Sequence, residues 1–298
     1  MTTRMKLALN PIQWMATNDG WLDPELAPEP AELLDQVKRA GFDHVMASVP
    51  AGLSGTEYVS LVEQAGLGLA PGYVTLRFDG SAGSAQAAVD TAVESARELA
   101  ELGLSTTGLG TNMVKGSPRV QTPAQGVDHD PSRLSAFVDA IGQAAERMAT
   151  YGIRPDLHPH VGTWIETEDE TRTVLDQLPA DLVGFLPDIG HLSWARADVG
   201  GLITQYQKRI SFLHIKDCRP EVADRGRELG WGYQQTVLQG LWVEPGRGGL
   251  DIRGLVDRLP DDFDGHLMVE VDRPDIADPR ASADASADWM RRAFEFDG

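Results

Sequence analysis

Short apolar runs of strand length alternate along the chain with longer segments in which apolar residues recur at helical spacing. This alternation is typical of a parallel sheet whose strands are joined by helices. The apolar runs predict eight strands, at residues 6–12, 44–49, 67–74, 104–110, 154–158, 183–187, 210–215 and 266–271. The segments of helical period predict helices at residues 31–40, 56–65, 85–102, 131–150, 168–177, 199–208, 252–259 and 281–294.

Eight strands that alternate with helices predict an α/β fold of one (β/α)8 TIM barrel. No linker or low-complexity segment divides the chain, so we expect residues 1–298 to form a single domain. Two connections are unusually long. Thr111 to Asp130 is polar and is expected to be a loop at the catalytic face, or else a disordered insertion.

The longer connection is an excursion from Arg219 to Gly249, after the seventh predicted strand. It contains a predicted helix at residues 221–229 and the aromatic residues Trp231, Tyr233 and Trp242. Aromatic side chains favour packing over exposure to solvent. We therefore expect the excursion to cover the site at the strand ends, or alternatively to form an oligomer interface.

The composition narrows the classes of partner and compartment. With 45 acidic and 26 basic residues, the formal net charge is −19, and such a surface repels the phosphates of nucleic acids. The only cysteine excludes an intramolecular disulfide and fits a reducing compartment. The first residues lack the apolar core of a signal peptide, and no run approaches the length of a membrane span. We expect a cytoplasmic protein that binds neither nucleic acid nor membrane.

Four chemically reactive side chains each end an apolar run: His158, Asp188, His214 and Glu270. A βα unit in a barrel takes about 30 residues, and the first two intervals are 30 residues (158 to 188) and 26 residues (188 to 214). The third, of 56 residues (214 to 270), accommodates the excursion. In a barrel these strand ends converge at one mouth, which predicts a metal site with two histidines and two carboxylates.

Such a ligand set suits Mn²⁺ or Co²⁺ best, with Zn²⁺ and Fe²⁺ as alternatives and Mg²⁺ less suited because it prefers oxygen ligands. Each residue also has a structural alternative. Asp188 could instead cap a short helix, Glu270 could form a salt bridge, and the histidines could be hydrogen-bonded core residues. His160 lies two residues after His158 and faces the same side if the segment is extended.

Two weaker signals are also present. The segment PGRGGLDI, from Pro245 to Ile252, resembles a phosphate-binding glycine loop, but it lacks the Lys-Ser/Thr pair of that motif. We interpret it as a turn before the next helix. Trp14, near a predicted loop face, could stack on a sugar or cyclitol ring, and core packing is the alternative.

Six motifs together resemble a known family: NPIQW, HPHVGT, DIGH, HIKDCRPE, PGRGGLDI and VEVD. The chain is similar to the xylose-isomerase-like (β/α)8 superfamily of sugar isomerases and epimerases, and most of all to myo-inosose dehydratases. The resemblance implies that the metal ligands are His158, Asp188, His214 and Glu270. It further implies that His191, Lys216 and Arg219 contact the substrate. Where keto-sugar epimerases carry a ligand glutamate, this chain has His158.

That difference favours elimination over epimerisation, because two-sided proton transfer uses two carboxylates. The resemblance therefore implies a metal-dependent carbon–oxygen lyase that removes water or another β-leaving group from a keto-cyclitol or keto-sugar. The candidates for proton transfer are His160, His191, Lys216 and Glu270. The alternatives are a sugar isomerase or epimerase, a C-glycoside-deglycosidase-type subunit acting on 3-keto-glycosides, and a noncatalytic barrel subunit. The expected partners are the small-molecule substrate and a second copy of the chain or a small accessory subunit.

Overall fold

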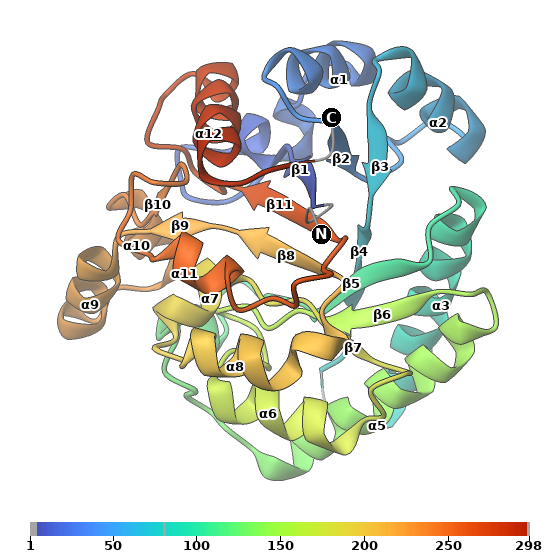
Figure 1. The fold of residues 1–298 in the computed structure, drawn as a ribbon. Helices are drawn as coiled ribbons and strands as arrows, with labels where there is room; N and C mark the ends of the chain where they lie inside the picture. Colours follow the sequence, from blue (N-terminus) through green and yellow to red (C-terminus); the bar gives the residue numbers. More distant parts are fainter. Residues whose placement is uncertain (1–4, 80–81, 297–298) are drawn as a thin grey trace. The chain divides into compact units, whose positions relative to one another are not determined.

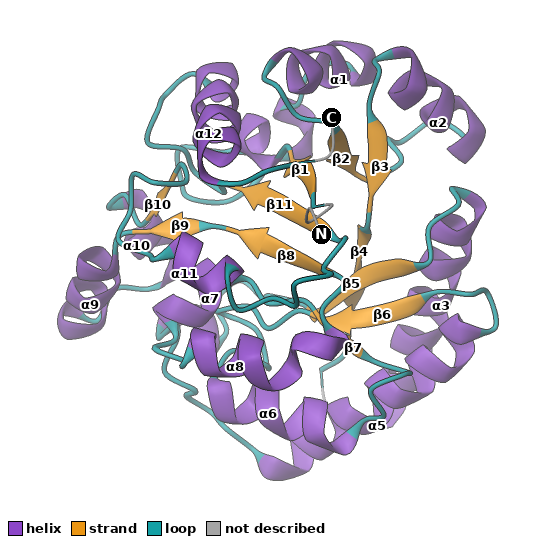
Figure 2. Cartoon of the chain, viewed as in Figure 1, coloured by secondary structure: helices purple, strands orange, loops and turns teal. Residues whose placement is uncertain are grey.

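The computed structural model describes residues 5–79 and 82–296. The chain forms two compact units, the first made of residues 1–70 and 212–298 and the second of residues 71–211. Each unit contains a parallel sheet and the helices that connect its strands (Figure 1, Figure 2). Within the described residues, no helix is both long and apolar enough to cross a bilayer.

The first unit has a five-stranded sheet in the order β3-β2-β1-β11-β8, and every neighbouring pair is parallel. Leu7, Ala8 and Leu9 of β1 and the residues from Leu267 to Val269 of β11 are fully buried. Burial of consecutive residues is expected when both faces of a parallel sheet are covered. The strands are β1 (Lys6–Asn10), β2 (His44–Met46), β3 (Gly68–Ala70), β8 (Phe212–Ile215) and β11 (His266–Glu270).

Helices connect these strands, and a separate antiparallel pair of strands, β9 and β10, follows β8. The pair is β9 (Asp217–Cys218) and β10 (Trp242–Val243). The α-helices are α1 (Pro30–Arg39), α2 (Gly55–Gln64), α9 (Pro220–Leu229), α10 (Tyr233–Leu238), α11 (Ile252–Val256) and α12 (Pro279–Ala293). Two short 3-10 helices follow β1, η1 (Ile12–Met15) and η2 (Pro24–Leu26).

The second unit has a four-stranded parallel sheet in the order β4-β5-β6-β7, and α3 packs against α5. The strands are β4 (Gly72–Leu76), β5 (Thr106–Thr111), β6 (Arg154–Leu157) and β7 (Gly184–Phe185). The helices are α3 (Ala82–Glu101), α4 (Pro118–Gln121), α5 (Pro131–Ala149), α6 (Glu168–Gln177), α7 (Ile189–Trp194), α8 (Val199–Tyr206) and the 3-10 helix η3 (Gln207–Arg209).

The predicted strand at residues 67–74 is the main difference from the sequence-based assignment. It is two strands, because β3 ends at Ala70 and β4 begins at Gly72. Pro71 lies between them and has no N–H group to donate to a strand ladder. The pattern of apolar residues continues through Pro71, so it does not reveal the break.

Both long connections contain ordered structure. The connection from Thr111 to Asp130 includes α4, and the side chain of Arg119 in that helix is buried, so this segment is not a disordered insertion. The excursion from Arg219 to Gly249 contains α9, α10 and β10. Its predicted helix at residues 221–229 is confirmed as α9, whereas α10 was not predicted.

Candidate active site

In the first unit, His214, Lys216 and Glu270 come together where β8 and β11 end. Parallel pairing sets Met268 beside His214, so Glu270 lies two residues further along β11. Nδ1 of His214 is 2.7 Å from Oε2 of Glu270, and Nζ of Lys216 is 3.1 Å from Oε1 of the same carboxylate. All three side chains are buried. The salt-bridge alternative for Glu270 is therefore present in the structure.

Asp272 is a fourth member of this group and was not among the residues predicted from the sequence. Its Oδ1 lies 2.7 Å from Nζ of Lys216. The motif VEVD contains the signal, because residues two apart in extended chain face the same side and Asp272 follows Glu270 by two. A buried ammonium with two carboxylate partners satisfies the requirement that buried charges be paired.

The excursion packs onto this group within the first unit. Trp242 pairs with Cys218 across the β9–β10 ladder, and its ring centre is 5.1 Å from Nζ of Lys216. From α10, the hydroxyl of Tyr233 is 3.5 Å from Oδ2 of Asp272. Aromatic side chains of the excursion thus cover Lys216 and contact its partner, in agreement with a covering role at these strand ends.

The glycine-rich segment before α11 is organised around Asp217. The N–H groups of Gly246 and Gly248 each donate to Oδ2 of Asp217 at 2.9 Å, and that of Leu250 donates to Oδ1 at 3.3 Å. Burial raises the pKa of Asp217, and these N–H groups act against that rise. The segment is a turn, as interpreted from the sequence, and its N–H groups are directed at a side chain of the protein.

Two predicted substrate-binding residues of the first unit have partners within the protein. Nε1 of Trp14 donates to Oε1 of Gln36 at 2.9 Å, and the Trp14 side chain is buried. Nη1 of Arg219 donates to the carbonyl of Gly240 at 2.9 Å, and Nη2 is 3.0 Å from Oδ1 of Asp275. These contacts fix both side chains, and their binding to a substrate stays a prediction.

In the second unit, three histidines form a cluster beyond the ends of β6 and β7. His158 directly follows β6, and its N–H donates to the carbonyl of Leu109 in β5 at 2.9 Å. The rings of His160 and His191 have centres 3.6 Å apart, and those of His158 and His191 are 6.3 Å apart. His158 and His191 are buried, whereas His160 is half-buried.

Asp188 connects β7 to the helix that carries His191. Its Oδ1 accepts hydrogen bonds from the N–H groups of Gly190 and His191, both at 2.9 Å, which makes Asp188 the N-cap of α7. The capping alternative is therefore correct, and it engages one of the two carboxylate oxygens. His158, Asp188 and His214 are each buried, and each offers one atom that could coordinate a metal ion.

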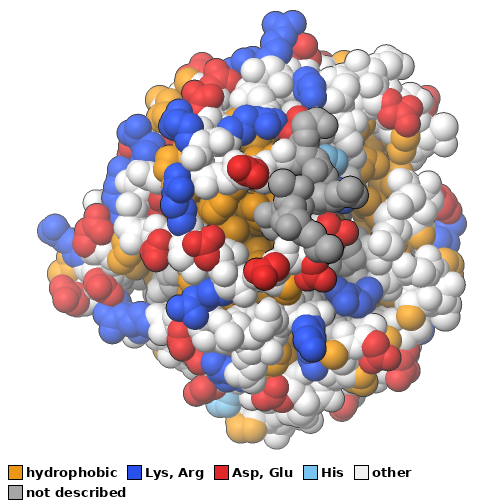
Figure 3. All heavy atoms as spheres, viewed as in Figure 1, with side chains coloured by type: hydrophobic (Ala, Val, Ile, Leu, Met, Phe, Trp, Pro, Cys, Tyr) orange, Lys and Arg blue, Asp and Glu red, His pale blue; other side chains and the backbone are white. Residues whose placement is uncertain are grey.

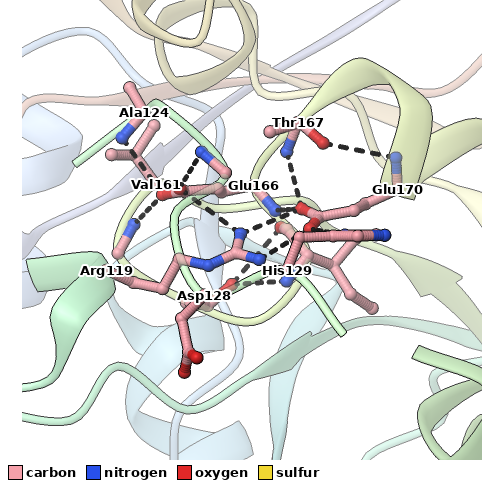
Figure 4. A network of polar contacts seen from close by, with 12 residues as sticks. Arg119, Ala124, Asp128, His129, Val161, Glu166, Thr167 and Glu170 are labelled. Atoms are coloured by element: carbon pink, nitrogen blue, oxygen red, sulfur yellow. Dashed lines mark hydrogen bonds and ion pairs between the residues drawn. The ribbon is translucent and has the colours of Figure 1, made fainter. Parts of the chain in front are cut away.

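A buried ion network of the second unit connects α4 with the start of α6 (Figure 4). Arg119 is 2.6 Å from Glu170 and 3.3 Å from Glu166, and all three side chains are buried. Burial by itself would raise the pKa of Glu170, but the Arg119 guanidinium and His129 lower it to about 2. Burial raises the pKa of Glu166, against the effect of the N–H groups and Arg119 that face it.

No motif or strand end in the sequence points to Arg119, Glu166 or Glu170 as site residues. One local signal existed, because Thr167 and Glu170 form a capping box at the start of α6, with the T-x-x-E pattern of that motif. No comparable local motif marks Arg119 or Glu166 as a buried charge. On the face shown in Figure 3, acidic and basic side chains are interspersed.

Comparison with known proteins establishes the family. The model of the family described as xylose isomerase-like TIM barrel matches residues 34–293, a range that includes most of both units. The chain belongs to this family. It therefore has the TIM-barrel fold, as the alternation of strands and helices predicts.

Two curated relatives illustrate what the chain is similar to. It is 28% identical over 285 residues to the rhizopine catabolism protein MocC of Rhizobium meliloti, covering 92% of this chain and 84% of that protein. It is 29% identical over 183 residues to the inosose dehydratase of Bacillus licheniformis, covering 61% of this chain and 58% of that enzyme. The second match thus spans little more than half of the dehydratase.

Solved structures share the fold. An L-ribulose 3-epimerase matches with a TM-score of 0.67 at 16% identity, covering 97% of this chain and 94% of that one. The IOLI protein with a bound zinc atom matches with a TM-score of 0.66 at 14% identity, covering 97% and 96%. A barrel protein of Mycobacterium smegmatis in complex with magnesium matches with a TM-score of 0.67 at 18% identity, covering 98% of each chain.

Proposed function

We propose that this protein is a metal-dependent carbon–oxygen lyase acting on a keto-cyclitol or keto-sugar. The observation that carries the proposal is the set of four side chains, His158, Asp188, His214 and Glu270, each buried at or just beyond the end of a parallel strand. In a TIM barrel the ends of all strands meet at one face. The family match includes residues of both units, so we treat residues 1–298 as one barrel domain.

The donor chemistry of these residues fits a divalent cation. Two imidazoles and two carboxylates provide the mixed nitrogen and oxygen ligands that Mn²⁺, Co²⁺, Zn²⁺ and Fe²⁺ accept, and we keep Mn²⁺ or Co²⁺ as the first choice. When bound, the cation would act as a Lewis acid that stabilises negative charge on the substrate carbonyl.

The protein's own groups would then move the protons. His160, in the loop after β6, and His191, on α7, provide neighbouring imidazoles, and one would remove the proton next to the carbonyl. Lys216, held by Glu270 and Asp272, provides an ammonium that could protonate the departing hydroxyl. The cover of Trp242 over Lys216 would exclude water, which strengthens electrostatic stabilisation at the reacting atoms.

The test combines metal analysis with turnover. Protein purified without chelator and resupplied with Mn²⁺, Co²⁺ or Zn²⁺ is incubated with a panel of inososes and 3-keto-glycosides. We expect stoichiometric metal and the ultraviolet absorbance of an enone, or release of an aglycone. Absence of both stoichiometric metal and product would refute the lyase and favour a noncatalytic barrel subunit.

A sugar isomerase or epimerase is the second candidate, and the fold match to an L-ribulose 3-epimerase favours it. Incubation with ketohexoses in deuterated water separates the two, since epimerisation places deuterium at the stereocentre without forming an unsaturated product. We expect His158→Glu to retain metal and to slow the elimination, because the change in ligand charge alters Lewis acidity. Efficient epimerisation without any enone would make this candidate the function.

A further inference from the structure

The carboxylate of Glu166 holds three backbone N–H groups at once (Figure 4). It accepts from Gly162 at 2.8 Å, from Gly126 at 2.9 Å and from Ala124 at 3.1 Å. All three donors have a left-handed backbone, with φ of 88°, 63° and 61° respectively. That conformation is unfavourable for alanine, so the hydrogen bond to Glu166 offsets strain in the loop before α5.

Arg119 balances the charge of this carboxylate. Its Nη1 is 3.3 Å from Oε1 of Glu166, and its guanidinium also forms two hydrogen bonds to Glu170, at 3.0 and 2.6 Å. The relative exposure of the three side chains is 2% or less. A buried carboxylate remains ionised only with compensating charge and hydrogen bonds. Arg119 thus allows Glu166 to act as an acceptor for backbone groups from two separate loops.

One of those backbone groups belongs to the peptide that contacts His160. The N–H of the Val161–Gly162 peptide donates to Glu166 at 2.8 Å, and the carbonyl of the same peptide is 2.7 Å from Nδ1 of His160. A trans peptide is planar, with its N–H and C=O pointing in opposite directions. Fixing the N–H therefore fixes where the carbonyl points.

A carbonyl oxygen can only accept a hydrogen bond. The hydrogen of the neutral His160 ring must therefore lie on Nδ1 when it bonds to Val161, which leaves the lone pair on Nε2. Rotation of the Val161–Gly162 peptide would remove the acceptor from Nδ1. Glycine at position 162 makes such a rotation inexpensive, so a restraint on its N–H has an effect on the histidine.

We propose that Glu166 and Arg119 are positioning residues for His160, acting through the Val161–Gly162 peptide so that Nε2 is presented as the proton acceptor. This inference rests on the proposed function, in which His160 is a candidate for proton transfer. Neither Glu166 nor Arg119 needs to touch the substrate. Their effect is on the rate of the chemical step, because a misdirected base lowers kcat more than it weakens substrate binding.

The experiment determines the tautomer of the His160 ring by NMR and measures turnover separately. Histidines are labelled with ¹⁵N, the His160 signals are assigned by their loss in His160→Gln, and long-range ¹H–¹⁵N correlations report which ring nitrogen carries hydrogen. We compare the wild type with Glu166→Gln, whose amide presents N–H groups to the three donors. The control is Asp169→Asn, an exposed carboxylate three residues further along the chain, in the first turn of α6.

In the wild type we expect hydrogen on Nδ1 of His160. In Glu166→Gln we expect a mixture of both tautomers, and with 2-keto-myo-inositol as the probe a kcat lower by about 10- to 100-fold with KM changed by less than about threefold. Arg119→Lys keeps a cation but loses the planar guanidinium with its paired N–H donors. Its change in tautomer and its loss of kcat should both be smaller than those of Glu166→Gln. Asp169→Asn should match the wild type in both measurements.

Hydrogen on Nε2 in the wild-type protein would overturn the inference, and this measurement needs no variant that might fail to fold. So would a folded Glu166→Gln protein with the wild-type tautomer and kcat. The two proposals can fail separately. If the tautomer changes as expected and no keto substrate is turned over, the positioning of His160 stands and the lyase assignment fails.

Discussion

Nζ of Lys216 lies 2.7 Å from Oδ1 of Asp272, and the lysine is fully buried. The same ammonium is 3.1 Å from Glu270, so one cation holds together two carboxylates at the end of β11. Without Lys216 these carboxylates would repel each other in a site with little solvent. The stability of the metal-free protein is therefore expected to depend on this lysine.

We predict that Lys216→Met lowers the free energy of unfolding by roughly 3–5 kcal/mol, the size expected when one partner of a buried ion pair is removed. Asp272→Asn should relieve part of that loss in the double variant, so the two effects should fall short of additivity by about 1 kcal/mol or more. Urea denaturation of the metal-free wild type, the two single variants and the double variant measures these free energies. Fully additive effects would show that the two residues are energetically independent.

Asp188→Asn separates the capping role of this residue from a metal-binding role. Asparagine is as good an N-cap as aspartate, so α7 and the free energy of unfolding should change little. The affinity for Mn²⁺ should fall at least about tenfold, an effect seen even for residues that only support a ligand. Calorimetric titration measures the affinity.

The matched control is Asp198→Asn, because Asp198 caps α8 in the same way, with its Oδ1 accepting from the N–H of Gly201 at 2.9 Å. It should leave Mn²⁺ binding at the wild-type level. Unchanged affinity in Asp188→Asn would remove Asp188 from the proposed ligands.

Asp217→Asn tests the anchor of the glycine-rich turn. The amide would present an NH₂ group to the backbone donors of Gly246, Gly248 and Leu250, leaving some of them without an acceptor. We predict a loss of about 2–3 kcal/mol of unfolding free energy and faster hydrogen exchange at these three amides. Asp251 is an exposed cap whose Oδ1 accepts from the N–H of Gly254, and Asp251→Asn should have little effect. Slow exchange retained in Asp217→Asn would contradict the assigned role.

His266 should make stability depend on pH. Burial, together with His44 and Lys6, lowers its pKa from 6.5 to about 3 in the folded protein. The unfolded chain therefore binds the proton more readily between these values, and the contribution of His266 to stability is lost as pH falls from about 6.5 towards 3. The ring of His44 packs edge-on against the ring of His266, and the two ring centres are 4.9 Å apart.

His266→Phe keeps an aromatic ring but cannot be protonated. Between pH 6.5 and pH 3.5 the free energy of unfolding should fall by about 2–4 kcal/mol less in the variant than in the wild type. This is smaller than the full pKa shift implies, because His266 is only half-buried. Denaturation curves measured across this range check it. Parallel pH dependences of the two proteins would show that His266 keeps an ordinary pKa.

Local patterns determined the arrangement of elements and the candidate residues. The predicted strands that end near His158, Asp188, His214 and Glu270 are confirmed in position, because alternation of apolar runs and helical periods depends on neighbouring residues alone. The capping of α7 by Asp188 could also be predicted as an alternative, because an N-cap bonds only to N–H groups two or three residues along the chain. The break at Pro71 was missed because the apolar pattern on both sides is uninterrupted.

The ion networks were decided by tertiary structure. Arg119 meets Glu170 across 51 positions of sequence, and Lys216 meets Glu270 across 54. No periodicity relates such pairs. A charged residue becomes buried only when a segment distant in the sequence packs over it. For Lys216 that segment is β10, which places Trp242 over the ammonium. The sequence therefore determined which side chains stand at the strand ends, and only packing decided which partners stabilise their charges, because burial of a charge depends on all the segments that surround it.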